Sequence, residues 1–491
     1  MNCARQLALI LALSAPLLAT NGMNLEGFGP IATGTGGAAM AHANGTGAMM
    51  SNPATLGLMA DGDRRIEMVL GYLGPDVGAA VATPQGSIGA TSAMDAIFMP
   101  ALGWAQKRGH VTWGLGVFAQ GGMGTEFSRS SWLADPSQGT NAGLTQGLLN
   151  RTEVSVGRVI LPLVYDVDER LHVGGSVDLV WAGIDIQMAL SEAQFVDLVT
   201  TQQRGTAGGS LTQVFGALYE PFGGTGVRRL HHAYFDFAND SDFTGQANGM
   251  GLAAKIGVVY EVSQELTVGA TYHSKTAIGN LETDQALMRM GVNADTGLLT
   301  TGTPNGQYAD LDLPVAGRVT IDDFQWPATL GLGVAYRAQE RLHLVADLRR
   351  IQWSGVMQGF RMQFTAADTP QNGGFAGQRL DTELLQKWED QTVLAFGAAY
   401  DVNHALQVRA GFNTGSNPVP DALLNALFPA IVERHFTLGA GYQLTQRTSL
   451  QLSYVRGSEA KFTNPGDGVG VPPVTSTHGQ NNLQVMYTFG W

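Results

Sequence analysis

The chain has 491 residues, of which 14% are charged and 65 are glycine, and its formal net charge is -13 at pH 7. This negative charge argues against a nucleic-acid partner. After the first twenty residues there is no run of about eighteen apolar residues, which excludes a transmembrane helix. Low charge, many glycines and dispersed apolar residues instead favour many strands, each with one apolar face.

The N-terminus has the pattern of a secretory signal peptide, predicted over residues 1–19. Arg5 supplies the positive charge, residues 7–18 supply the apolar stretch, and cleavage is expected after Ala19, with Gly22 as the alternative. A short buried helix is the other interpretation. Cys3 is the only cysteine, so the mature chain would hold no thiol for a disulfide, a zinc thiolate site or a nucleophile. We expect no metal and no cofactor.

Apolar and polar residues alternate with period two along several stretches, which is typical of strands with unlike faces. The clearest stretches are residues 171–179, 266–272, 406–412 and 436–442. A barrel with a lipid-facing side and a polar lumen gives this pattern. A soluble β-sandwich gives it too, so alternation alone leaves both open.

The turns favour the barrel, because six short turns each follow an aromatic residue and alternate with seven long connections. A membrane barrel has short turns at one end, long loops at the other, and aromatic girdles at the interfaces. The aromatic residues are Trp104 (turn 105–109), Tyr165, Tyr260, Tyr336, Tyr400 and Tyr442. The long connections lie near residues 73–95, 120–152, 189–248, 279–317, 354–391, 413–433 and 456–480.

We therefore predict an all-β fold in which residues 63–491 form a transmembrane antiparallel β-barrel of about fourteen strands. The first strand is expected to start near Arg65, and both termini to lie in the periplasm, below the cell outer membrane. We expect a monomer. Pro327 falls inside the strand expected from Arg318 to Tyr336, and since proline cannot donate to a ladder, it predicts a bulge there.

The last strand carries Leu483, Val485, Tyr487, Phe489 and Trp491 on one face. A C-terminal aromatic residue after such alternation resembles the signal that the outer-membrane assembly machinery recognises. An ordinary terminal edge strand is the alternative.

Residues 20–62 are small and glycine-rich and do not alternate, as in 33–39 and 51–56. A disordered tail would be more polar, so we predict a plug, or hatch, inside the lumen. The glycine run is not a phosphate-binding loop, because no strand precedes it and no lysine follows.

The long connections contain apolar residues at helical spacing, which predicts short helices outside the membrane. One helix is expected over 210–219, one after a Ser191 cap with Phe195, Leu198 and Val199, and one from Asp421 with apolar residues up to Ile431. These residues form either a core between loops or an apolar ligand groove. The candidate groove residues are Trp132, Leu133, Leu148, Leu211, Val214, Phe215 and Leu218, and Leu144 and Leu149 belong to the same connection as the first three.

Four segments, in this order along the strand pattern, resemble the FadL-type long-chain fatty acid transporter family over nearly the whole mature chain. Asn52-Pro53-Ala54 resembles the hatch signature, and Gly116 to Phe127 resembles the third strand. Phe324-Gln325-Trp326-Pro327 resembles the strand-eight motif, and Ser416-Asn417-Pro418-Val419-Pro420 the proline-rich turn before a loop helix.

The resemblance implies passive uptake of fatty acids or other hydrophobic compounds such as hydrocarbons across the outer membrane, among its lipid and lipopolysaccharide. The ligand would enter an outer groove, the hatch at Asn52, Pro53 and Ala54 would shift, and the ligand would leave sideways where the third strand kinks. Gly121, Gly122 and Gly124 suit this lateral gate because glycine tolerates unusual backbone angles. Simpler interpretations are a barrel-rim bulge at the glycines and a helix end at Asn52 and Pro53.

Two other function classes are considered. An enzyme is not expected, because His273-Ser274 and His231-His232 have no convincing partners, and adjacent strand residues point to opposite faces. A general or substrate-selective diffusion porin is the alternative, which rapid sugar flux would support. A fatty acid would favour a cation for its carboxylate, for which Arg228, Arg229 and Lys255, besides Arg204, are candidates. A hydrocarbon needs none.

Overall fold

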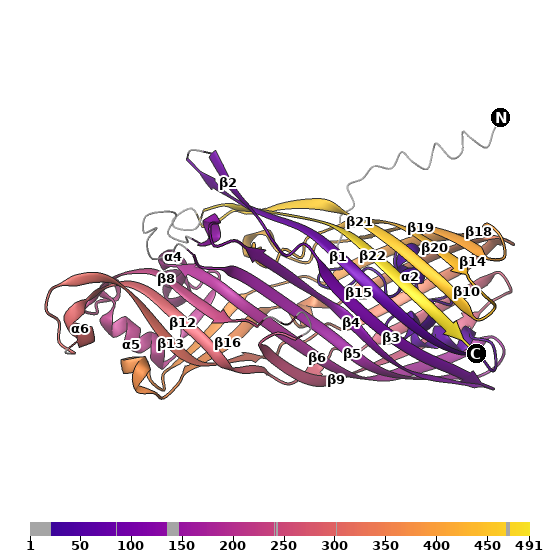
Figure 1. The fold of residues 1–491 in the computed structure, drawn as a ribbon, viewed down its shortest axis with the longest axis horizontal. Helices are drawn as coiled ribbons and strands as arrows, with labels where there is room; N and C mark the ends of the chain where they lie inside the picture. The colour runs from indigo at the N-terminus through magenta and orange to yellow at the C-terminus, as the bar shows by residue number, and fades with distance from the viewer. Residues whose placement is uncertain are drawn as a thin grey trace.

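The computed structural model describes residues 21–84, 86–134, 147–239, 241, 244–300, 302–467 and 472–491. The predicted signal peptide therefore lies outside the described residues. The described strands form one 22-stranded sheet, and it closes on itself because the last strand pairs with the first (Figure 1). The predicted antiparallel β-barrel is confirmed, and the sandwich alternative is excluded.

The ring of the barrel is built from neighbouring antiparallel strands that each pair with the next. Their order is β1 (Arg64–Thr83), β3 (Ile97–Arg108), β4 (Val111–Phe127), β5 (Asn150–Asp166), β6 (Leu171–Ser191), β9 (Ala247–Glu261), β10 (Leu266–His273), β14 (Thr329–Gln339), β15 (Leu342–Ile351), β18 (Gln391–Asp401), β19 (Leu406–Gly415), β20 (Arg434–Gln443), β21 (Thr448–Asn464) and β22 (Val474–Gly490), which returns to β1. The end of the ring with the short turns is called the short-turn end, and the other the long-loop end.

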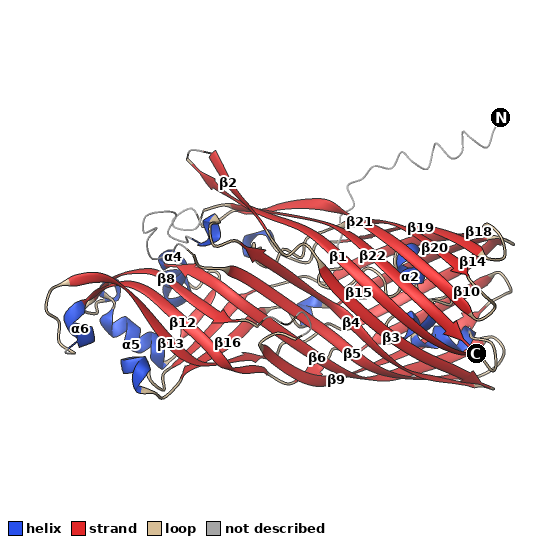
Figure 2. Ribbon diagram, in the orientation of Figure 1, coloured by secondary structure: helices blue, strands red, loops and turns tan. Residues whose placement is uncertain are grey.

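The predicted count of about fourteen strands does not match the sheet, because the long connections contain strands of their own. From β6 the sheet continues through β8, β12, β13, β16, β17 and β7, and this extension lies beyond the long-loop end of the ring (Figure 2). The added strands are β2 (Gly86–Thr91), β7 (Gly205–Gly208), β8 (Val227–Phe237), β11 (Ala277–Ile278), β12 (Leu281–Asp295), β13 (Tyr308–Asp322), β16 (Gly359–Ala366) and β17 (Arg379–Leu385).

The ring is apolar outside and polar inside, the reverse of a soluble protein. Leu163 on β5 and Leu438 on β20 are 61% and 60% exposed, whereas Asp178 on β6 is 0% exposed. Tyrosines are exposed near the short-turn end, at Tyr165, Tyr260, Tyr336, Tyr400 and Tyr442. This distribution is that of a lipid-facing wall with an aromatic girdle. None of the described helices is long and apolar enough to cross a membrane.

Two of the three predicted loop helices are present. Ser191 caps α4 (Glu192–Val196) in a capping box with Gln194. In α5 (Ser210–Leu218) Leu211 and Phe215 are buried. The other helices and short helical turns are α2 (Pro30–Gly34), α6 (Thr296–Thr300), η1 (Gly45–Met49), η2 (Pro53–Leu58), η3 (Trp132–Ala134), η4 (Asp197–Thr201), η5 (Glu220–Phe222), η6 (Trp353–Gly355), η7 (Pro370–Phe375) and η8 (Asp421–Leu423).

The prediction of a helix from Asp421 to Ile431 was wrong. Only the turn η8 forms, and Leu424 already has the extended angles φ -61 and ψ 121. Pro429 explains the failure, because its ring would clash with the carbonyl of Asn425 in a helix and it has no N–H to donate.

Two predicted strand boundaries also need correction. No strand spans Pro327: β13 ends at Asp322 and joins the extension, whereas β14 starts at Thr329 in the ring. A proline without an N–H suits the crossing between the two parts of the sheet rather than a bulge. The strand through Trp104 continues to Arg108, and Gly109, with φ 57, allows the tight hairpin to β4.

Candidate functional site

The N-terminal segment from residue 21 to 62 lies against inward-facing side chains of the ring, which bind its backbone. Asp347 on β15 accepts the N–H of Ala39 at 2.6 Å and of Met40 at 3.2 Å. Glu67 on β1 accepts the N–H of Thr46 at 2.6 Å. Buried backbone groups must be paired, and here the polar lumen pairs them. The segment is therefore hydrogen-bonded to inward-facing side chains of two walls, β15 and β1.

Asn52 caps the start of η2. The simpler interpretation of Asn52 and Pro53 as the end of a helix was therefore wrong. Its Oδ1 accepts the N–H of Ala54 at 3.1 Å, and Pro53 occupies the first helical position, where no N–H is needed. Its Nδ2 donates to the carbonyls of Met40 at 2.8 Å and Val258 at 3.2 Å. Asn52 thus ties two parts of the segment to β9.

The three glycines of β4 that were predicted to form the lateral gate have different neighbours. The β4–β5 register shifts between Ala119 and Gly121, and the Gly122 N–H donates to the Met23 carbonyl oxygen at 3.0 Å. A Cβ on Gly121 would lie 2.1 Å from that oxygen, whereas a Cβ on Gly124 would meet the flexible Met94 side chain at 2.0 Å. Glycine is required at Gly121 because the N-terminal segment approaches the strand closely.

The ladder between β3 and β4 stops halfway, which leaves a pairing gap in the wall. Pairing of β3 with β4 ends at Leu102–Val117, although β4 pairs with β5 up to Phe127. Residues 97–101 and 118–126 thus face each other without ladder pairs, and all of them are described. The gap closes at the long-loop end, where Ala93 N–H donates to Glu126 O at 2.7 Å. Behind it, Leu25 and residues 27–29 border a cavity of about 30 Å³.

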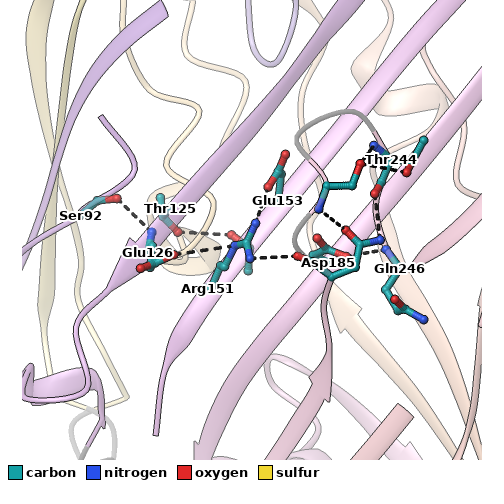
Figure 3. A network of polar contacts seen from close by, with 11 residues as sticks. Ser92, Thr125, Glu126, Arg151, Glu153, Asp185, Thr244 and Gln246 are labelled. Atoms are coloured by element: carbon teal, nitrogen blue, oxygen red, sulfur yellow. Dashed lines mark hydrogen bonds and ion pairs between the residues drawn. The ribbon is translucent and has the colours of Figure 1, made fainter. Parts of the chain in front are cut away.

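A polar network holds the rim beside the pairing gap (Figure 3). Arg151 on β5 lies 2.8 Å from the Glu153 carboxylate and 3.9 Å from that of Glu126 on β4. The Glu126 N–H donates to Ser92 Oγ at 3.0 Å, and Asp185 on β6 accepts the N–H of Gln246. The long-loop ends of β4 and β5 are therefore joined to each other and to residue 92, and β6 is joined to the residue that precedes β9.

A cavity of about 220 Å³ lies at the long-loop end, between the ring and the extension, and is called the outer cavity. Its lining is mainly apolar and comes mostly from η3, β6, η4, β17, the 422–427 segment and the start of β22. The apolar side chains are those of Trp132, Leu133, Met188, Ala189, Leu190, Leu198, Leu384, Leu385, Ala422, Leu423, Leu424, Ala426, Leu427, Pro472 and Val474.

Among the described residues that line the outer cavity, only Asp197 and Arg204 are charged. Asp197 accepts the backbone N–H groups of Gln203 and Arg204, each at 3.1 Å. Arg204 Nη1 lies 3.3 Å from Asp467 Oδ2. Both charges are thus neutralised or bound by the chain itself.

The predicted groove residues are divided between several places. Trp132 and Leu133 line the outer cavity, and Leu211 and Phe215 line a neighbouring apolar cavity of about 30 Å³. Leu148 is buried, Val214 and Leu218 are half-buried on α5, and Leu144 lies outside the described residues. Met188 and Leu384 were missed, because they are strand residues and give no helical periodicity.

The outer cavity is joined to β4 through the carbonyl of Leu427. This oxygen accepts the Thr125 hydroxyl of β4 at 3.0 Å and the Thr152 hydroxyl of β5 at 2.6 Å. The 422–427 segment is therefore hydrogen-bonded to the strand that borders the pairing gap. Glu433 lies just before the first residue of β20, and burial raises the pKa of its carboxyl to about 7.

Residues 19–489 match the family described as outer membrane protein transport protein (OMPP1/FadL/TodX). The chain belongs to this family. It is an outer-membrane β-barrel protein, and the match covers the N-terminal segment, the pairing gap and the outer cavity.

Several solved structures of this family are similar over almost the whole chain. The toluene transporter TodX from Pseudomonas putida is 26% identical with a TM-score of 0.76, covering 95% of this chain and 99% of that chain. The toluene transporter TbuX from Ralstonia pickettii is 26% identical with a TM-score of 0.72 and the same coverage. A Pseudomonas aeruginosa FadL homologue, 15% identical with a TM-score of 0.66 over 95% and 99%, shows the shared fold.

Two curated relatives match in part. The 47 kDa outer membrane protein of Pasteurella multocida (strain Pm70) is 25% identical over 255 residues, which is 50% of this chain and 52% of that protein. An uncharacterised protein from Chlorobium limicola is 43% identical over 75 residues, 15% of this chain and 37% of that protein. The chain thus spans between about a third and about half of the length of these relatives.

In this family member the predicted carboxylate partners are not brought together. Arg228 lies over the ring of Tyr308, 3.4 Å from its centroid, and Arg229 is exposed. Neither lines the outer cavity. Lys255 is buried on the lumen side of β9 and pairs with Asp178, which also lies 2.8 Å from Arg158. Each of the three has a different environment.

Proposed function

We propose that this protein passes small neutral hydrocarbons, of the size of a single aromatic ring, passively across the outer membrane. The observation that carries the proposal is the outer cavity, which is mainly apolar, measures about 220 Å³ and has both lining charges satisfied by the chain. A cavity of about 150 Å³ suffices for benzene, whereas drug-sized ligands occupy roughly 300–1,000 Å³. The 26% identical toluene transporters support this ligand class.

The proposed route begins at the long-loop end, which we assign to the cell exterior, with both termini in the periplasm. The ligand enters the outer cavity, and the segment 20–62, including Asn52, Pro53 and Ala54, acts as the hatch of the barrel 63–491. The ligand then leaves sideways through the pairing gap beside Gly121, Gly122 and Gly124. A lateral exit suits an apolar solute, since a water-filled pore gives it no favourable surroundings.

A long-chain fatty acid is the less supported ligand, because the one cation that lines the outer cavity among the described residues is already paired. A diffusion porin is also less supported, because the N-terminal segment is bound to opposite walls of the lumen.

Two measurements test the proposal. Equilibrium dialysis of radiolabelled toluene against the protein in phosphatidylcholine nanodiscs, corrected with empty nanodiscs, is expected to show saturable binding. Proteoliposomes are expected to swell no faster in arabinose than protein-free liposomes. Absence of saturable toluene binding, or rapid swelling in arabinose, would contradict the proposal.

A further inference from the structure

Arg204 is held in the wall of the outer cavity by both of its backbone groups. Its N–H donates to Asp197 Oδ2 at 3.1 Å, and its carbonyl oxygen accepts the N–H of Leu385 at 2.9 Å. The next residue, Gly205, starts β7, and a Cβ there would lie 2.0 Å from the Glu383 carbonyl oxygen. The strand therefore lies tightly against β17, and the backbone of Arg204 is held in a fixed position in the cavity wall.

The guanidinium of Arg204 needs a counter-charge, because it lies at an apolar cavity and its side chain is only 20% exposed. Asp197 does not supply it, since its carboxylate accepts the hydroxyl of Thr201 as well as two backbone N–H groups. The charge partner of Arg204 is Asp467, which lies 263 positions away in the sequence.

Asp467 is positioned by the end of β21, whose last residue is Asn464. Asn464 Nδ2 donates to the carbonyl of Leu424 at 2.9 Å, which ties this segment to the cavity lining, and its Oδ1 accepts the N–H of Gly466 at 3.0 Å. The Asp467 side chain is 17% exposed. The outer cavity thus has a fixed cation and, next to it, a fixed anion from a distant part of the chain.

We propose that Asp467 determines the charge specificity of the outer cavity, an inference that rests on the proposed function. By occupying Arg204, Asp467 denies an aromatic carboxylate its best partner, and a carboxylate ligand would also be repelled by the Asp467 charge. A neutral ring meets neither effect. Without Asp467, the same cavity would hold an unpaired arginine, the side chain that best binds carboxylates.

The competing explanation is that the ion pair only joins two segments of the chain. Two variants separate these explanations, because both remove the ion pair between Arg204 and Asp467, and only one of them keeps the charge of Arg204. Asp467→Asn leaves Arg204 charged, whereas the double variant Arg204→Met with Asp467→Asn removes both charges. Toluene and benzoate are the matched probes, since they differ by a methyl group against a carboxylate.

The experiment is equilibrium dialysis of each labelled probe at pH 7.5 and low salt, with the protein in phosphatidylcholine nanodiscs. Asp467→Asn is expected to bind benzoate on the order of tenfold more tightly than the unmodified protein, as for a hydrogen bond to a charged group. This gain should weaken as salt is added. The double variant should show no gain, and toluene affinity should stay within about threefold in both variants.

Each outcome has one meaning. If the unmodified protein binds toluene and Asp467→Asn gains no benzoate affinity, or if the double variant gains as much, the inference is overturned. If the unmodified protein itself fails to bind toluene, the proposed function fails instead. Folding is checked by the heat-dependent shift of the barrel in gel electrophoresis. Should Asp467→Asn not fold, Asp467→Ser, which also leaves Arg204 charged, replaces it.

Discussion

The lumen and the outer cavity of this barrel use polar side chains in opposite ways. In the lumen, Asp347 and Glu67 bind backbone N–H groups of the N-terminal segment, so these carboxylates are used to hold the chain. Around the outer cavity, Asp197 and Asp467 satisfy groups of the wall, and the remaining lining is mainly apolar. Buried backbone demands polar partners, whereas an apolar cavity without such demands suits a hydrocarbon.

The largest effect is expected from removing the polar lumen contact of Asp347. Asp347→Ala leaves the N–H groups of Ala39 and Met40 without their acceptor, at a cost of about 3 kcal/mol. The N-terminal segment should loosen, and arabinose should swell proteoliposomes faster. Asp401→Ala, which removes a half-exposed lumen carboxylate paired with His343, is the control. Equal swelling for the two variants would show that Asp347 does not hold the segment.

The next largest effect is expected in the outer cavity. Leu384→Asp places a carboxylate in the lining of the outer cavity, and toluene affinity should fall by about tenfold or more, because a charge prefers water to an apolar site. The control is Ile88→Asp, since Ile88 is 51% exposed on β2 and does not line the cavity. Unchanged toluene affinity in Leu384→Asp would place the binding site elsewhere.

A smaller effect separates two glycines of β4. Gly121→Ala should displace the Met23 backbone at a cost of about 1–3 kcal/mol, because backbone moves less easily than a flexible side chain. Gly124→Ala should cost less, since the atoms it would meet most closely belong to the flexible Met94 side chain. Protease cleavage within residues 21–29, followed by mass spectrometry, should be faster in Gly121→Ala. Equal rates would mean that the glycines serve only the strand.

The smallest effect is a pH dependence at Glu433. Its folded-state pKa of about 7 lies above the ordinary 4.5, because burial disfavours the charged form. The folded state therefore binds more protons, and stability falls as the pH rises from about 4.5 through 7. Glu433→Gln should raise the thermal midpoint at pH 8 and leave it nearly unchanged at pH 4. A larger gain at pH 4 would contradict this assignment.

Local patterns predicted the ring but not its extension. The alternation around Leu438 and the turns after Tyr165 and Tyr400 depend on neighbouring residues, and the structure has strands and turns there. The strands of the extension were not predicted, because each pairs with a strand from a separate connection, as β7 does with β17. Helical periodicity found α4 and α5 and failed after Asp421, where Pro429 interrupts the pattern.

The candidate site was predicted in part. The roles of Gly121, Gly122 and Asn52 stay predictions, but the structure gives these residues contacts with the N-terminal segment, or within it and to β9, that no local pattern shows. The outer cavity was only half anticipated: Trp132 and Leu133 stand at helical spacing in a loop, whereas Leu384 lies on a strand.

Period-two alternation and turn chemistry are local properties, and they were enough to predict an antiparallel barrel with one apolar face. Where the wall lacks ladder pairs and which charges meet depend instead on contacts between distant parts of the chain, which no local pattern contains. Arg204 and Asp467 are 263 positions apart and have no shared motif. They become partners because β7 pairs with β17 and the end of β21 is hydrogen-bonded to Leu424, so that distant parts of the chain close the outer cavity.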